Sequence, residues 1–173
     1  IIVVNGISYP SSPAGSNENL CWSTYLGGGN EDYIEGVDVD VSGAHFVIGT
    51  TFSSNFPVLT GAFTNISGGY DAFLVKFRST HFRQWGTFLG GGSNDWSNDV
   101  KVRSSGNGNP YMVGATTSSD FPFLWKVGAH NDTLLSGGQD GFVAEFFNSN
   151  GVAKWISHFR GTGNDVINSV DFD

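Results

Sequence analysis

The stretch WSTYLGGG at residues 22–29 returns as WGTFLGGG at residues 85–92 and, in a weaker form, as WISHFRGT at residues 155–162. The tryptophans that open these copies lie 63 and then 70 residues apart. A sequence that resembles itself at a fixed long period is typical of repeat proteins, in which each repeat forms one supersecondary unit. The chain is therefore predicted to be built from successive copies of one such unit.

The similarity extends beyond the glycine-rich loops. Two further segments of the first repeat return in the second: SSNFP as SSDFP, and GGYDAF as GGQDGF, starting at residues 53, 118, 68 and 137. The second repeat is longer because it has insertions near residues 107–108 and 125–126, and turns tolerate insertions. We divide the chain into an N-terminal strand and linker that could end a preceding repeat, a first repeat, a second repeat and the start of a third: residues 1–21, 22–84, 85–154 and 155–173.

Each repeat is predicted to form four β-strands. In the first repeat they span residues 34–41, 45–51, 72–77 and 84–89. The second and third strands carry apolar side chains on both faces, as Val47, Ala72 and Leu74 illustrate, so the sheet should be buried on both sides. Four-stranded antiparallel meanders stacked around an axis bury both faces, which predicts an all-β chain of β-propeller blades. A β-sandwich, the main rival, gives no reason for the repeat.

The composition excludes several classes of partner. The net charge is −8 with only eight Lys and Arg, so nucleic acid and anionic membrane surfaces would be repelled. The longest purely aliphatic run is residues 1–4, whereas roughly 20 residues are needed to span a bilayer as a helix. Cys21 is the only cysteine. A single cysteine cannot form an internal disulfide, and we interpret Cys21 as a small buried side chain rather than a reactive thiol.

The motifs resemble those of the SBBP-type β-propeller repeat of large secreted and surface-exposed bacterial proteins. The similarity covers residues 22–173 and includes the WSTYLGG stretch, Asp32-Tyr33, the VDVD run at residues 37–40 and the GYDAFLVK run at residues 69–76. The resemblance implies a seven-bladed ring and a structural module without assigned chemistry. Since propellers close with about 4–8 blades, the chain is expected to be part of a larger propeller, packed against other blades or domains of a parent protein.

The repeated polar and aromatic positions are interpreted as structural. Calcium binding is an alternative for the glycine-rich loops, with Glu31, Asp32, Asp95 and Asp165 as candidate ligands. A residue that returns at the same position in every repeat, however, is expected to have a structural role that every repeat shares. A carboxylate at a turn has such a role, because it accepts hydrogen bonds from backbone N–H groups. Asp71 and Asp140 receive the same interpretation. The repeated tryptophans are predicted to pack between blades rather than to stack on sugars: Trp22, Trp85 and Trp155.

Function is expected where the repeats differ. Five residues on two sets of loops that would share one rim form the candidate ligand-binding surface: Tyr33, Trp96, Phe123, Trp125 and Lys126. We predict a non-catalytic extracellular scaffold or recognition propeller at a bacterial cell surface, without a cofactor, that contacts a surface protein or a glycan. The alternative is a glycan-binding or glycan-active propeller. The low lysine content, the richness in Asn, Ser and Gly and the resemblance to the SBBP-type repeat favour the cell exterior, and the sequons at Asn65 and Asn131 are two small further signals.

Overall fold

The computed structural model describes residues 2–4, 22–58, 60–105, 108–124 and 138–173. These parts of the chain contain β-strands and no helix, so none of them holds a helix that could cross a membrane. The strands are β1 (Ile2–Val4), β2 (Trp22–Thr24), β3 (Asp32–Val39), β4 (His45–Thr51), β5 (Asp71–Phe77), β6 (Arg83–Leu89), β7 (Asp95–Val102), β8 (Pro110–Thr116), β9 (Asp140–Phe146) and β10 (Ala153–Phe159).

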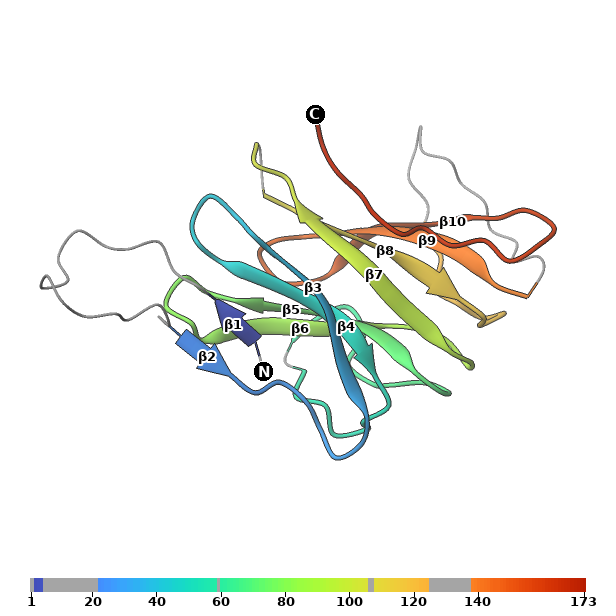
Figure 1. Ribbon diagram of the computed structural model, residues 1–173, viewed down its shortest axis with the longest axis horizontal. Coiled ribbons are helices and arrows are strands. Elements are labelled where there is room, and N and C mark those ends of the chain that lie inside the picture. Colours follow the sequence, from blue (N-terminus) through green and yellow to red (C-terminus); the bar gives the residue numbers. More distant parts are fainter. Residues whose placement is uncertain (1, 5–21, 59, 106–107, 125–137) are drawn as a thin grey trace, which may run out of the picture.

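Eight of these strands form two four-stranded antiparallel sheets, which confirms the all-β prediction (Figure 1). The first sheet has the order β3-β4-β5-β6 and the second the order β7-β8-β9-β10, so each is a meander of sequential neighbours. The first strand of each sheet carries a register shift, between Ile34 and Gly36 in β3 and between Ser97 and Asp99 in β7. The two repeats therefore share an irregularity as well as a topology.

The predicted bounds of the first strand are wrong by about two residues at each end. The strand starts at Asp32, which pairs with Thr51, because the ladder continues into the glycine-rich loop. It ends at Val39 because the Asp40 carboxylate accepts hydrogen bonds from the backbone N–H groups of Ser42 and Ala44, at 2.9 and 3.0 Å. Gly43, at φ +80°, completes that turn in a conformation that L side chains rarely adopt.

The two sheets pack face to face around a shared apolar core. Every residue of β4 and β5 is buried, since both faces of the first sheet are covered. On one face, Phe46, Ile48 and Leu74 belong to the same buried cluster as Val100 and Met112 of the second sheet. Figure 1 shows β7 crossing the first sheet, where it contacts β3, β4 and β5. The other face of the first sheet carries a smaller cluster that includes Phe73, Val75 and Phe88.

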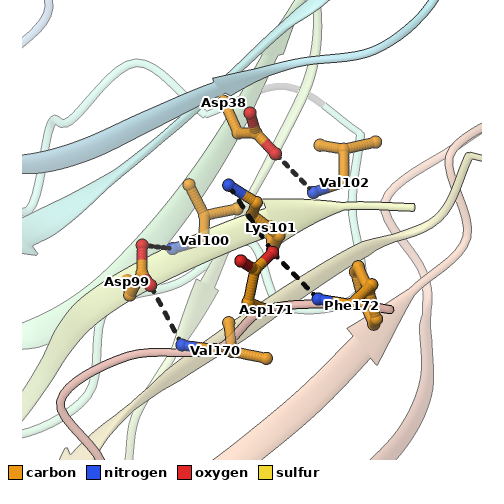
Figure 2. A network of polar contacts seen from close by, with 8 residues as sticks. All are labelled: Asp38, Asp99, Val100, Lys101, Val102, Val170, Asp171 and Phe172. Carbon is orange, nitrogen blue, oxygen red and sulfur yellow. Dashed lines mark hydrogen bonds and ion pairs between the residues drawn. The ribbon is translucent and has the colours of Figure 1, made fainter. Parts of the chain in front are cut away.

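Polar contacts accompany this apolar packing where β7 meets β3 and where the segment after β10 meets β7 (Figure 2). The Asp38 carboxylate accepts a hydrogen bond from the Val102 backbone N–H at 2.7 Å. The Asp99 carboxylate accepts one from the Val170 N–H at 3.0 Å, so the last residues of the chain lie against β7. The Lys101 ammonium lies 3.8 Å from the Asp171 carboxylate. The segment after β10 thus contacts the second sheet in much the way that β7 contacts the first.

The short strands β1 and β2 pair antiparallel, with Val4 opposite Trp22. Lys76 and Trp85 stand opposite each other in the same way in β5 and β6. Trp22 stacks on His81 of the β5–β6 turn, with ring centroids 5.0 Å apart and planes inclined by 15°. Trp22 and Trp85 are equivalent positions of the repeat, and each pairs with a residue of the preceding strand. The β1–β2 pair therefore resembles the pair formed by the third and fourth strands of the first sheet.

Candidate functional site

The glycine-rich loops are closed by their aspartates. Asp32 Oδ2 accepts hydrogen bonds from the Gly28 N–H at 2.7 Å and from the Ser53 hydroxyl at 3.0 Å. Asp95 Oδ2 accepts the same pair of bonds, from the Gly91 N–H at 2.7 Å and the Ser118 hydroxyl at 2.8 Å. These donors occupy carboxylate lone pairs that a cation would otherwise use.

The two remaining candidate calcium ligands, Asp165 and Glu31, also accept hydrogen bonds from protein groups. Asp165 accepts a hydrogen bond from the Gly161 N–H, as the other two aspartates do from their own loops. Glu31, the fourth candidate ligand, is turned toward Tyr70, whose hydroxyl donates to its carboxylate. Over the described ranges, no group of three or more Asp, Glu, His or Cys side chains is arranged to hold a metal ion. Calcium binding therefore stays a prediction for which the described residues offer no group of ligands.

Asp71 and Asp95 converge beside Gly90, where the first sheet meets the second. A methyl group at Gly90 would lie 2.3 Å from Asp71 Oδ1 and 2.9 Å from Asp95 Oδ2. Asp71 Oδ2 accepts the Ser67 N–H at 2.8 Å, whereas its buried Oδ1 has no hydrogen-bond partner among the described residues. Burial raises the pKa of Asp71 to about 7, with repulsion from Asp95 and Asp120 adding to it and the Ser67 bond opposing it. Burial also raises the pKa of Asp95.

Asp140 is the counterpart of Asp71 in the second sheet. It begins β9, is buried like Asp71, and pairs with Thr116 as Asp71 pairs with Thr51. At this junction Arg160 follows β10 in the place that Gly90 has after β6. The two junctions therefore share the buried carboxylate and differ in the residue that follows the last strand of the sheet.

The repeated tryptophans lie in packed surroundings. Trp85 is 1% exposed and donates its indole N–H at 2.9 Å to the carbonyl of Asn148, in the turn between β9 and β10. Its ring covers Gly151, where an added methyl group would lie 2.4 Å away. Trp155 is also buried and donates its indole N–H to Glu145. Trp22 is half-buried against His81. Each of these indoles thus packs against protein groups.

An aromatic patch lies where β3 begins and β4 ends. Tyr33 and Phe52 are 49% and 46% exposed, and both contact Tyr70, with ring centroids 6.4 and 5.2 Å apart. The Tyr70 hydroxyl donates to Glu31, and this bond raises the pKa of Tyr70 to about 12. We call these four residues the rim patch: Glu31, Tyr33, Phe52 and Tyr70.

Two of the other predicted rim residues, Trp96 and Phe123, belong to the described part of the chain. Trp96, in β7, is half-buried and follows Asp95 as Tyr33 follows Asp32. Phe123 packs against His158 of β10, with ring centroids 5.9 Å apart. Trp125 and Lys126 lie outside the described residues, as does Cys21.

The structure instead groups Tyr33 with Tyr70, which in turn contacts Phe52 and Glu31. Phe52 and Tyr70 were not predicted to bind a ligand, and Glu31 was predicted only as a calcium ligand. A signal for the two missed aromatic residues exists in the repeat alignment, because Phe52 aligns with Thr117 and Tyr70 aligns with Gln139. Both positions change from an aromatic to a polar side chain, so the difference between the repeats marks the rim patch.

Comparisons with known proteins identify no family. No model of a known protein family matches the chain, and no curated protein matches it. The resemblance to the SBBP-type repeat therefore rests on the motifs in the sequence alone.

Proposed function

We propose that this chain is a non-catalytic scaffold and recognition module made of β-propeller blades, and that it works outside a bacterial cell, at the surface. The observation that carries the proposal is the stacking of two similar four-stranded sheets through the first strand of the second. A stack of this kind can be extended at its open face, as propellers require. The external location is supported by the SBBP-type resemblance and the low lysine content.

The first sheet has an apolar surface that the second sheet lacks. Val37 and Val39 of β3 are 51% and 47% exposed. Their counterparts in β7, Val100 and Val102, are 2% and 7% exposed because they pack against the first sheet. The exposed surface of β3 therefore suits a further blade, contributed by the parent protein, that would cover it as the first sheet covers β7.

Recognition rather than catalysis is supported by how the carboxylates are used. Asp32 and Asp95 accept hydrogen bonds from loop N–H groups and hydroxyls, which fixes the loops that support the rim. The rim patch then offers exposed rings on a fixed support, an arrangement suited to binding. A glycan-binding or glycan-active propeller is the second candidate, and the rim patch is the observation that favours it.

The exposed surface of β3 can be tested with the chain itself. We expect the wild-type chain to self-associate in sedimentation velocity, because apolar patches on the surface promote association. The double substitution Val37→Lys and Val39→Lys should shift the chain toward monomer. The control is Val41→Lys, since Val41 lies beyond β3 and is 84% exposed. Equal association of all three proteins would contradict the proposed blade-docking surface.

The non-catalytic part of the proposal has its own test. The chain is incubated with glycans and peptides, and product release is followed by mass spectrometry. We expect no turnover. Turnover that disappears in Glu31→Gln would refute the proposal and favour the glycan-active alternative.

A further inference from the structure

The rim patch is held rigidly by the backbone beneath it. The Phe52 N–H donates to the Glu31 carbonyl at 2.9 Å, and the Asn30 side-chain amide donates to the Phe52 carbonyl at 3.2 Å. The Tyr70 N–H donates to the Asn94 side chain at 3.1 Å. Thr51 and Asp71, the chain neighbours of Phe52 and Tyr70, pair in the β4–β5 ladder, and Tyr33 pairs with Thr50. The strand ends that carry the three aromatic residues are therefore already tied together. A ligand that binds there loses little free energy in ordering them.

The rings form a platform rather than a cage. An aromatic cage for a methylated ammonium needs a cation-sized space between rings that face it. Here Tyr70 lies in direct contact with both other rings, at centroid distances of 5.2 and 6.4 Å and interplanar angles of 41° and 47°. The free surfaces of Tyr33 and Phe52 face outward, toward solvent. A flat apolar face, such as the C–H face of a sugar ring, fits such a surface better than a compact cation.

The polar part of the patch fits hydroxyl groups. Glu31 is exposed, and one of its carboxylate oxygens accepts the Tyr70 hydroxyl. A carboxylate has two oxygens and about four lone-pair sites, so Glu31 can also accept a hydrogen bond from a ligand hydroxyl. The carboxylate and the net charge of −8 would repel a uronate or a sulfated sugar.

We propose that the rim patch binds a neutral carbohydrate, with sugar rings on Tyr33 and Phe52 and a sugar hydroxyl on Glu31. This inference rests on the proposed recognition function and gives it a ligand class. It also explains why the second repeat has Thr117 and Gln139 where the first has Phe52 and Tyr70. A ligand that binds at one junction of a stack needs its contact residues in one repeat only.

The experiment measures binding of the 173-residue chain to defined sugars by ligand-observed NMR and isothermal titration calorimetry. The probes are neutral cello-, xylo-, manno- and galacto-oligosaccharides, an oligogalacturonate, and choline. We expect saturable binding of at least one neutral oligosaccharide. Tyr33→Ala and Phe52→Ala should each weaken it roughly 2- to 10-fold. Glu31→Gln should weaken it as well, with the fold retained.

Phe82→Ala is the matched control, because Phe82 is 75% exposed but lies in the β5–β6 turn, at the opposite end of β5 from Tyr70. It should leave the affinity unchanged. The inference is overturned if no neutral sugar binds at millimolar concentration, if choline or the oligogalacturonate binds in preference, or if Tyr33→Ala and Phe52→Ala bind as wild type does. Cleavage of a bound sugar would instead refute the non-catalytic function and leave the carbohydrate site standing.

Discussion

The buried carboxylate of Asp71 should make the stability of the chain fall as the pH rises from 5 to 8. Its pKa is raised from 3.8 to about 7 in the folded chain, since burial disfavours the charged form. Between these values the folded state holds a proton that the unfolded state has released, so stability is highest below the lower pKa and declines up to the higher one. A difference of one between the folded and unfolded pKa values corresponds to about 1.4 kcal/mol, so the whole shift has an upper limit of about 4 kcal/mol, of which about 2 kcal/mol falls above pH 5.5.

Three other groups have shifted pKa values, and the direction of each shift determines its effect on the pH dependence of stability. Burial also raises the pKa of Asp95, a shift in the same direction as that of Asp71. The pKa of His45 is lowered, first by burial and then by His81, so it stabilises the chain as the pH rises toward 6.5 and partly offsets the decline. Burial opposes the ionisation of Asp40, but its hydrogen bonds outweigh burial and lower its pKa, so it is ionised throughout and contributes no slope.

Urea unfolding at pH 5.5, 6.5 and 8.0 tests this reasoning. Asp71→Asn should remove most of the decline, because asparagine keeps the shape and cannot ionise. Asp40→Asn is the control: it should lower stability at every pH, because a neutral amide oxygen accepts the Ser42 and Ala44 N–H groups more weakly than a carboxylate does, and it should leave the decline caused by Asp71 in place. Parallel pH profiles for wild type and Asp71→Asn would refute the assignment of the buried charge to Asp71.

Two further substitutions test the sheet-to-sheet contacts. Gly151→Ala should destabilise the chain by about 1–3 kcal/mol in urea unfolding, because Gly151 has φ +71° and its added methyl group would meet the Trp85 ring; a change below about 0.5 kcal/mol would count against this packing. Asp38→Ala should cost about 1–3 kcal/mol and speed amide hydrogen exchange at Val102, whose N–H it leaves without its acceptor. Unchanged exchange at Val102 would contradict that hydrogen bond.

The sequence was sufficient to predict the two four-stranded sheets because a repeat shows which strands are equivalent. The glycine-rich loops align the two repeats, and this alignment makes Val37 of the first equivalent to Val100 of the second. The first strand was misplaced because its start depends on the pairing of Asp32 with Thr51, a contact between strands that alternation along one strand does not show.

The candidate site could be predicted only in part. Tyr33 was identified from its position in the repeat, but its partnership with Tyr70 depends on how two loops meet. The bond between Tyr70 and Glu31 joins residues 39 positions apart, which no local pattern encodes. Phe123 packs on His158 because the loop that carries it bridges to β10 at Leu124 and Ile156, a contact that the repeat alignment does not show.

The contacts in Figure 2 have a consequence for how such a chain can grow by duplication. Asp38, Lys101 and Asp171 hold the same position in three successive repeats, so the charge there changes sign from each repeat to the next. The Lys101 ammonium lies 3.8 Å from the Asp171 carboxylate, and the Asp38 carboxylate accepts a hydrogen bond from the N–H of Val102, the residue after Lys101. Tandem copying of a single repeat would set two aspartates or two lysines side by side. Gene duplication of such a module would thus favour copying repeats in pairs.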